Sequence, residues 1–436
     1  MYYEPTTHSR EITPAWVAGV VGGMLHPPVA PALDLAWDSR NVGPGTGFVA
    51  LPGERTHGRE FAKEALGRGA AWVLTDRAHP GAIQVKNPYQ ALIKLGRAFR
   101  DRFKGKLVAV GGSSGKTTTK EALAQGLGWP APKGNLNTPA ALARFFWHLE
   151  EPGEGAVVEL GIDRLGEMDE LVTLAAPNLG LITTLGAEHL DGLGCLENVV
   201  NEESKLLRTS NKKLASVQAA KFLDLPGLKT YGFEAGDFAG ENLELKESSS
   251  RFVFGEHTVT VPYPGVGPAL GALAALAVAA VLGKNLAEVA ERLSALTLPP
   301  GRMERVVAGG VSLINDAYNS NPASVSAGME YLKRQPGRKW VVLGEMKELG
   351  KESEKLHLEA AHLAKQASDC LIFLGSHAEA QAREAGGNYF STQEEVLEFL
   401  LANVQAGDLV YLKASRSVGL EKLFSELVQA LERWQP

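Results

Sequence analysis

The chain has 436 residues, of which 44% are apolar and 22% charged, and its formal net charge is -6. This length exceeds one compact core and predicts two to four domains. The composition is that of a soluble globular protein, and the negative charge argues against an overall basic field that would recruit nucleic acid. An anionic substrate would therefore have to meet local cations and backbone N–H groups.

Targeting and redox signals point to the cytoplasm. The sequence opens without a basic start followed by an apolar core, so we expect no signal peptide. The most apolar stretch, residues 269–283, is shorter than the roughly 20 residues that a membrane crossing needs, and we expect a buried helix and no membrane partner. Cys195 and Cys370 have no metal-like spacing, which favours a reducing compartment without disulfides or zinc.

Three segments each alternate strand-like and helix-like patterns, and we place their boundaries at residues 1–104, 105–299 and 300–436. Near-continuous apolar runs in the second and third segments are typical of parallel strands that are buried on both faces. We therefore predict an α/β protein of three domains, the second and third with largely parallel sheets. The expected strands are 33–37, 47–51, 70–75, 107–110, 156–160, 179–185, 311–315, 340–343, 371–374 and 409–412, and the expected helices include 62–66, 89–103 and one that starts near Lys116.

The strongest local signal is the stretch GGSSGKTTTKE, which follows a buried strand and opens a helix. Glycines let backbone N–H groups close around phosphate oxygens, and the helix N-terminus adds partial positive charge. A lysine can neutralise the β- and γ-phosphates, and a threonine hydroxyl can bind Mg²⁺. An ordinary glycine-rich turn is the alternative, but the order of lysine and threonine favours an ATP phosphate loop, formed by Gly112, Ser113, Ser114, Gly115, Lys116, Thr117 and Thr118.

Two further residues are expected at the same edge of the sheet. Glu159 ends the buried strand of VVELG, and His189 follows the next apolar strand in LGAEHLDGLG. Ligand groups gather at the carboxyl ends of parallel strands, and a carboxylate beside a phosphate loop is a candidate Mg²⁺ ligand. Taken alone, Glu159 is equally well explained as a salt-bridged edge residue, and a lone histidine is more often structural. Their shared position favours a catalytic role for Lys116, Glu159 and His189.

The third segment offers weaker candidates. Asp316, Asn319 and Asn321 lie between a strand and a helix, where such residues are frequently helix caps. Later strands are followed by Glu345, Lys413 and Arg416, which we expect on one rim of the third sheet. Exposed charges after strands are usually just solvated, so none of these residues defines a site by itself.

Together these segments closely resemble the Mur ligases. The resemblance covers nearly the whole chain, through DSR, GFVALPGERTHG, GGSSGKTT, GNLNTP, VVELG, AEHLDGLG, PGRMERV, NDAYNSNPAS, VLGEMKELGKES and KASRS. The last three point to the type that joins D-alanyl-D-alanine to UDP-N-acetylmuramoyl-tripeptide. The resemblance implies an enzyme with an N-terminal UDP-substrate domain, a central ATP domain and a C-terminal Rossmann-like domain. We also expect a monomer, although the sequence does not determine the oligomeric state.

The resemblance also implies roles for single residues. Ser39 and Arg40 would lie near the UDP part, and Asn135 and Asn137 would face the reacting groups. Magnesium would be held by Thr117, Glu159 and His189. Nucleotide contacts across the domain cleft would come from Arg302, Asp316 and Asn319, and the closed form or the dipeptide would be secured by Lys413, Ser415 and Arg416.

The sequence departs from the family at three places. Gly111 stands where the family has threonine, and Gly267, Pro268 and Gly271 occupy the polar positions of a His-Asn-x-x-Asn motif, so the adenine contact does not carry over. Most importantly, Glu203 stands where these enzymes commonly carry a carbamylated lysine, with Lys205 two residues further on. We expect Glu203 to replace the carbamate at the magnesium site; the alternative is a residue on a solvated helix face.

Three functions remain open at this point. The chemistry of the parts fits a ligase that activates a carboxylate as an acyl phosphate with ATP and Mg²⁺. A sister ligase would add a single amino acid to a shorter muramoyl peptide, or glutamate to a folate. A nucleotide-binding regulatory protein without ligase activity is the alternative from another class, and the altered His-Asn-x-x-Asn region is what makes it conceivable.

Overall fold

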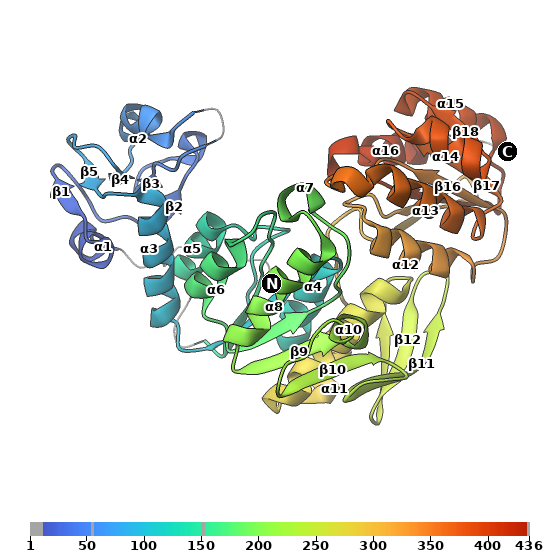
Figure 1. Ribbon diagram of the computed structural model, residues 1–436, viewed down its shortest axis with the longest axis horizontal. Helices are drawn as coiled ribbons and strands as arrows, with labels where there is room; N and C mark the ends of the chain where they lie inside the picture. The colour runs from blue at the N-terminus through green and yellow to red at the C-terminus, as the bar shows by residue number, and fades with distance from the viewer. Residues whose placement is uncertain (1–11, 54–55, 150–152, 434–436) are drawn as a thin grey trace.

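The computed structural model describes residues 12–53, 56–149 and 153–433. It shows three α/β domains, which follow one another in chain order from blue through green to red (Figure 1). Each domain is built around one sheet, of five, eight and six strands respectively. The predicted fold class is confirmed. Residues 1–11, on which the expected absence of a signal peptide depends, lie outside the described residues.

The first domain has the strand order β1-β5-β4-β3-β2, with parallel pairs except for the edge strand β1. Between β2 and β3, Asp38 caps the 3-10 turn that holds Ser39 and Arg40. The elements are α1 (Pro14–Val21), β1 (Met24–His26), β2 (Asp34–Ala36), η1 (Ser39–Asn41), β3 (Thr46–Val49), η2 (Gly58–Phe61), α2 (Ala62–Gly67), β4 (Trp72–Thr75), β5 (Ala82–Gln84) and α3 (Pro88–Arg102).

The second domain has the strand order β13-β12-β11-β10-β9-β8-β6-β7 and is parallel from β7 to β11. Because β6 lies between β7 and β8, the carboxyl ends of these three strands meet at one edge. The elements are β6 (Lys106–Gly111), α4 (Lys116–Leu127), α5 (Pro139–His148), β7 (Gly155–Glu159), α6 (Glu167–Ala175), β8 (Leu179–Ile182), α7 (Leu190–Leu193), α8 (Leu196–Thr209), β9 (Lys212–Ser216), α9 (Val217–Ala220), β10 (Leu228–Phe233), β11 (Phe238–Leu245), β12 (Ser250–Phe254), β13 (His257–Val261), α10 (Val266–Leu282) and α11 (Leu286–Leu293).

The third domain has the strand order β14-β15-β19-β16-β17-β18, antiparallel only at the edge pair β14–β15. Its elements are β14 (Glu304–Ala308), β15 (Val311–Asn315), α12 (Pro322–Leu332), β16 (Lys339–Leu343), η3 (Gly350–Glu352), α13 (Ser353–Lys365), β17 (Cys370–Leu374), α14 (Ala378–Ala385), β18 (Asn388–Phe390), α15 (Gln393–Asn403), β19 (Leu409–Lys413), η4 (Arg416–Val418) and α16 (Leu420–Glu432).

The Ala-rich run is the buried helix α10, which packs against the phosphate-loop helix α4. All but one of its alanines have no exposed surface, as expected for a helix enclosed by the domain core. Among the described residues, no helix is long and apolar enough to cross a membrane. The expectation of a buried helix is therefore confirmed.

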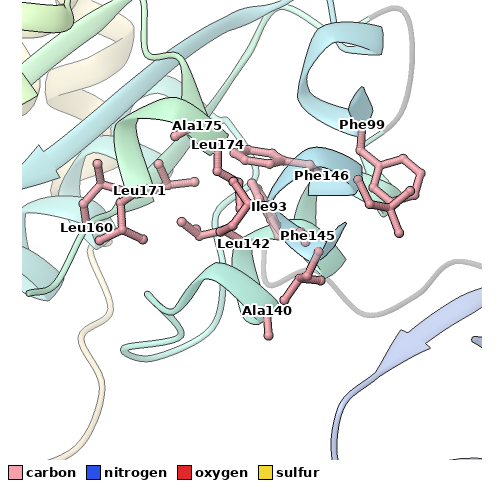
Figure 2. Close-up of a cluster of buried hydrophobic side chains, with 14 of the residues drawn as sticks. Ile93, Phe99, Ala140, Leu142, Phe145, Phe146, Leu160, Leu171, Leu174 and Ala175 are labelled. Carbon is pink, nitrogen blue, oxygen red and sulfur yellow. The ribbon is translucent and has the colours of Figure 1, made fainter. Parts of the chain in front are cut away.

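The apolar side chains form separate cores that define how the domains join. One core is shared by the first and second domains, because α3 packs between α1 on one side and α5 and α6 on the other. Figure 2 shows Ile93 and Phe99 of α3 beside Leu142, Phe145 and Phe146 of α5. The third domain has its own two cores, one on each face of its sheet.

Candidate active site

The phosphate loop connects β6 to α4 at the edge where β6, β7 and β8 end. Gly112 and Gly115 have φ angles of 113° and 83°, which L side chains rarely adopt. Gly115 is the N-cap of α4, and no side chain caps this helix. The N–H groups of its first turn are therefore available to phosphate oxygens, with the helix dipole in support.

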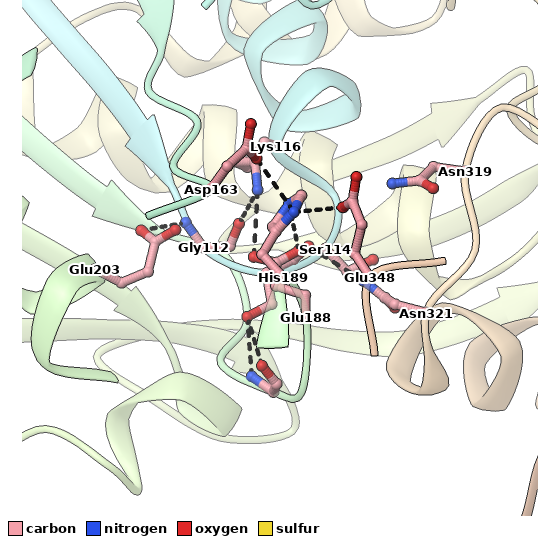
Figure 3. A network of polar contacts seen from close by, with 12 residues as sticks. Gly112, Ser114, Lys116, Asp163, Glu188, His189, Glu203, Asn319, Asn321 and Glu348 are labelled. Atoms are coloured by element: carbon pink, nitrogen blue, oxygen red, sulfur yellow. Dashed lines mark hydrogen bonds and ion pairs between the residues drawn. The ribbon is translucent and has the colours of Figure 1, made fainter. Parts of the chain in front are cut away.

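Lys116 is the last residue of this loop and the first of α4, and its ammonium group contacts Gly112 and Glu188 (Figure 3). Its Nζ donates to the Gly112 carbonyl oxygen at 2.6 Å and lies 3.5 Å from Glu188 Oε1. Burial lowers the pKa of Lys116, but the charges of Glu188, Glu203 and Glu159 outweigh burial, and the pKa is raised above its usual value. Lys116 is therefore a cation at neutral pH.

Three carboxylates surround this cation, although sequence reasoning named only two of them. Glu159, at the end of β7, is 1% exposed, and its Oε1 accepts a hydrogen bond of 3.3 Å from Asn137 Nδ2. Its Oε2 is buried without a hydrogen-bond partner. Glu188 is also buried, and burial raises its pKa against the opposing charge of Lys116. The sequence could have indicated Glu188, because it immediately precedes His189 after strand β8.

His189 stands where the second and third domains meet. Its φ of 47° is in the left-handed region, which is unfavourable for a residue other than glycine and is often found at functional sites. Its Nδ1 lies 2.5 Å from Glu348 Oε2 of the third domain and 3.2 Å from Asp163 Oδ1. Burial lowers the pKa of His189, but the hydrogen bond to Glu348 and the charge of Glu188 outweigh burial and raise it.

Glu203 lies behind the phosphate loop, on the buried face of α8, and it does not line the cavity. Its Oε2 accepts a hydrogen bond of 2.7 Å from the Gly112 N–H, whereas its Oε1 is buried without a hydrogen-bond partner. Burial raises the pKa of Glu203 to about 7, opposed by the charge of Lys116. Placement on a solvated helix face, the alternative considered above, is therefore wrong. Lys205 points elsewhere and pairs with Asp169 and Glu202.

The third domain closes the cleft with the segment that follows β15. Asn321 caps α12 in a capping box, and its Nδ2 also donates to the Ser113 carbonyl oxygen of the phosphate loop at 3.2 Å. Asp316 is held from behind by Lys413 Nζ at 2.7 Å and by the Tyr411 hydroxyl at 2.8 Å. The cap expected at this junction is therefore Asn321, which also bridges the two domains.

A cavity of about 470 Å³ lies between the second and third domains. Of the predicted residues, it is lined by Ser113, Ser114, Gly115, Lys116, Thr117, Thr118, Asn135, Asn137, Glu159, His189, Arg302, Asp316, Asn319, Asn321 and Lys413. The glycine-rich stretch from Gly265 to Gly271 forms another part of its wall. Arg302 stacks on Tyr318, with its guanidinium carbon 4.0 Å from the ring centre, and Tyr318 is a lining residue that the sequence did not single out.

The remaining predicted residues lie outside this cavity. Ser39 and Arg40 are in the first domain, where Arg40 is largely exposed and pairs with Asp38 at 2.6 Å. Ser415 is buried, and its hydroxyl accepts a hydrogen bond from the Lys347 N–H, so it fixes two loops against each other. The guanidinium carbon of Arg416 lies 5.2 Å from the Tyr318 ring centre, at the rim of the cleft.

Comparisons with known proteins agree with this arrangement. Family models match in all three domains: "Mur ligase family, catalytic domain" at residues 35–98, "Mur ligase middle domain" at 110–279 and "Mur ligase, glutamate ligase domain" at 301–416. The UDP-N-acetylmuramoyl-tripeptide--D-alanyl-D-alanine ligase of Escherichia coli is 30% identical, over 91% of this chain and 92% of its own length. This chain belongs to the Mur ligase family.

Another relative by sequence and two solved structures also match along most of the chain. The Bacillus subtilis UDP-N-acetylmuramoyl-tripeptide--D-alanyl-D-alanine ligase is 29% identical over 91% of this chain and 93% of its own. A MurF structure from Acinetobacter baumannii superposes with a TM-score of 0.89 at 27% identity, covering 96% of this chain and 99% of that one. MurF ligase from Thermotoga maritima, in complex with ADP, superposes with a TM-score of 0.81 at 28% identity, covering 92% and 98%.

Sequence reasoning did not assign Glu348 to the site. Glu348 reaches from the third domain to His189, and the Leu190 N–H donates to the Glu348 carbonyl oxygen at 2.7 Å. The stretch GEMKELG was recognised as specific to one type of Mur ligase, but its partner across the cleft could not be read from the sequence. Contacts between domains leave no periodic pattern in the sequence, so they cannot be predicted from it.

Proposed function

We propose that this Mur ligase joins D-alanyl-D-alanine to UDP-N-acetylmuramoyl-tripeptide at the expense of ATP. The observation that carries the proposal is the cleft itself, where a charged Lys116 on a phosphate loop faces buried carboxylates of the second domain. The third domain covers this group with the segment from Asp316 to Asn321. The relatives that match along the whole chain carry this ligase name.

The reaction proceeds in two steps. An oxygen of the peptide carboxylate attacks the γ-phosphorus of ATP, the bond to the β,γ-bridging oxygen breaks, and ADP leaves. The dipeptide amine then attacks the carbonyl carbon of the acyl phosphate, loses a proton, and releases phosphate as the amide forms. Carboxylate and phosphate are both anions, so Lys116 and the first N–H groups of α4 must neutralise the charge that builds up between them.

The residues present fit a magnesium ion beside the phosphates. Glu159 Oε2 is buried without a hydrogen-bond partner, as expected for a carboxylate oxygen that binds a cation. Among the described residues no three His, Cys, Asp or Glu side chains form a ready cage, which suits Mg²⁺ because it usually keeps waters and phosphate oxygens as ligands. Thr117, Glu159 and His189 would hold the ion, and Glu203 would add negative charge from behind the loop. Bound there, Mg²⁺ neutralises phosphate charge during transfer.

The other predicted roles follow the layout of the three domains. Ser39 and Arg40 would meet the UDP part of the substrate in the first domain, and Asn135 and Asn137 would face the reacting carboxylate. On the side of the third domain, Arg302, Asp316 and Asn319 would contact the nucleotide. Lys413 and Ser415 hold the loops of the third domain that border the cleft and would fix their position. Arg416 lies near Tyr318 and would bind the dipeptide.

Domain limits, setting and assembly are part of the same proposal. We place the limits at residues 1–104, 105–299 and 300–436, and each sheet lies within one of these segments. The enzyme works as a monomer in the cytoplasm, where ATP and a nucleotide-linked sugar peptide meet, and it needs no nucleic acid or membrane. Both cysteines are free thiols, in keeping with a reducing compartment.

A matrix of substrates tests the proposed function. UDP-muramoyl dipeptides and tripeptides, and a folate, are each combined with D-alanyl-D-alanine or single amino acids, and phosphate release is measured. We expect release only when UDP-N-acetylmuramoyl-tripeptide and D-alanyl-D-alanine are both present. Equal or faster turnover with a single amino acid would reassign the chain to a sister ligase. ATP binding without turnover for any pair would indicate a regulatory nucleotide-binding protein.

A further inference from the structure

A buried glutamate, Glu203, contacts the phosphate loop from behind. Glu203 is fully buried on α8, and its Oε2 accepts a hydrogen bond of 2.7 Å from the Gly112 N–H. The carbonyl oxygen of the same Gly112 accepts the Lys116 ammonium group at 2.6 Å. A chain of contacts therefore runs from Glu203 through one residue of the loop to the cation that faces ATP (Figure 3).

Gly111, the last residue of β6, makes room for this carboxylate. Its φ lies outside the left-handed region, so the backbone does not require glycine here. A Cβ atom at this position would lie 2.6 Å from Glu203 Oε2 and 3.0 Å from side-chain carbons of Ile182 and Leu206. A larger residue at position 111 would therefore push the Glu203 carboxylate away from the Gly112 N–H. Because Glu203 is fully buried, its side chain cannot avoid this clash by turning toward solvent.

Burying a carboxylate is costly, because it loses its hydration and only part of that loss is recovered by hydrogen bonds. Glu203 recovers part of it at the Gly112 N–H and through the charge of Lys116, whereas its Oε1 has no hydrogen-bond partner. An apolar residue would fill this place in α8, between buried neighbours such as Val199 and Leu206, at a lower cost. Stability alone therefore does not account for a glutamate here.

We propose that Gly111 and Glu203 are a matched pair that positions the phosphate loop for ATP. Glu203 fixes the Gly112 peptide group, which in turn fixes Lys116, and the missing side chain at Gly111 leaves the space that Glu203 needs. Glu203 is a positioning residue, because it acts on the nucleotide through Gly112 and Lys116. The inference rests on the proposed function only in that this loop binds ATP.

A double-mutant cycle tests the pair. The dissociation constant of ATP with Mg²⁺ is measured by calorimetry for the wild type, Gly111→Ala, Glu203→Ala and the double variant, with thermal unfolding in parallel. Each single change should weaken ATP binding by about 10-fold, since each removes a charge-assisted hydrogen bond that orders the loop. The double variant should bind no worse than Glu203→Ala, because the clash is gone and the hydrogen bond is already lost. Losses that multiply in the double variant, or single variants that bind like the wild type, would overturn the pair.

Two further variants separate positioning from general damage. Gly126→Ala adds a methyl group to a tightly packed glycine of α4 away from the loop, and it should bind ATP like the wild type. Glu203→Gln keeps an oxygen acceptor for the Gly112 N–H, so its ATP affinity should stay within about 3-fold of the wild type. If Gly111→Ala does not fold, the contrast between Glu203→Gln and Glu203→Ala decides, and equal affinities for these two variants would reject the proposal.

Hydrogen exchange tests the pair of Gly111 and Glu203 independently of whether the protein is a ligase. The Gly112 amide should exchange slowly in the protein without ligands and much faster in Glu203→Ala, while amides of the sheet centre keep their rates. This measurement needs neither ATP nor a muramoyl peptide. A wild type that failed to bind ATP would contradict the proposed function, whereas unchanged Gly112 exchange in Glu203→Ala would contradict the pair.

Discussion

The second domain joins its two neighbours in different ways. With the first domain it shares a continuous apolar core, in which α3 lies against α5 and α6 (Figure 2). An ion-pair group adds to this junction, because Asp34 of β2 accepts hydrogen bonds from Arg144 at 2.6 Å and from His148 at 2.7 Å. Packed apolar surface of this kind holds two domains as one body.

The junction with the third domain is polar and surrounds the cleft. Hydrogen bonds and ion pairs connect Asn321 with Ser113, Glu348 with His189, and Arg305 with Glu247. The apolar cores on its two sides remain separate clusters. The two ion pairs have one partner more than half exposed, and such pairs contribute only about 0.2–1 kcal/mol each. A ligase must admit two substrates and then exclude water, and a polar junction on one side of the cleft with a firmly packed pair of domains on the other suits that sequence.

The largest effect is expected inside the cleft and should appear in rate alone. Lys116→Ala removes the cation that stabilises the transferring phosphate, so kcat should fall by roughly 100-fold or more. The fold should persist, because the lysine faces the cavity and its removal leaves the apolar cores intact. Steady-state phosphate release and a thermal unfolding curve measure both quantities.

Lys422→Ala is the matched control for Lys116→Ala, since it removes an exposed lysine of α16 far from the cleft. It should leave both the rate and the melting temperature unchanged. Near-normal turnover in a folded Lys116→Ala enzyme would remove the phosphate loop from the mechanism.

The rigid junction should show the opposite pattern, a loss of stability without a loss of rate. Asp34→Asn breaks the charged contacts to Arg144 and His148 and should destabilise the protein by about 1–2 kcal/mol. Burial raises the pKa of Asp34, but the hydrogen bonds from His148 and Arg144 outweigh burial and hold it well below its usual value. The stabilisation is therefore present above about pH 4 and is lost as the pH falls through the lowered pKa.

Denaturant unfolding at several pH values measures this loss. The stability difference between wild type and Asp34→Asn should shrink as the pH drops toward 2. A difference that is constant across this range would mean that the Asp34 charge does not support the junction.

The smallest effect is expected at the polar junction. Glu348→Gln removes the charge that pairs with His189, but the Glu348 backbone contact to Leu190 remains. Because Glu348 is half exposed, the pair should contribute under 1 kcal/mol, and KM for ATP should rise by about 2- to 5-fold. The melting temperature of the body formed by the first and second domains should be unchanged in the same samples. A KM that rose more than about 20-fold would show that this junction is far stronger than its exposure suggests.

The sequence predicted the parts of the molecule that depend on local patterns. Buried parallel strands such as β6 and β7 were recognised because they are short apolar runs, and the loop after β6 because glycine, lysine and threonine occur in a fixed order. Strands β9 to β13 were not predicted, since their side chains are partly exposed and their pattern is mixed. Glu348 could not be found because its partner His189 is more than 100 residues away in the chain, and Tyr318 could not be found because only the fold shows that it lines the cavity.

Glu203 shows how far reasoning from a family pattern reaches. Its position in the sequence predicted a carboxylate that takes part in the magnesium site, and the structure places this carboxylate behind the phosphate loop, on the Gly112 N–H. The reason is the unusual Gly111, whose missing side chain admits the carboxylate. The two departures from the family were read separately in the sequence but are in contact in the fold.

An isotope experiment tests the central claim, an acyl phosphate formed in this cleft, most directly. UDP-N-acetylmuramoyl-tripeptide labelled with ¹⁸O in its reacting carboxylate is incubated with ATP, Mg²⁺ and D-alanyl-D-alanine, and the released phosphate is analysed by mass spectrometry. The account predicts one ¹⁸O atom transferred to each phosphate, together with a product that has gained the dipeptide. Phosphate without the label would contradict the account, because ATP would then have been hydrolysed by water.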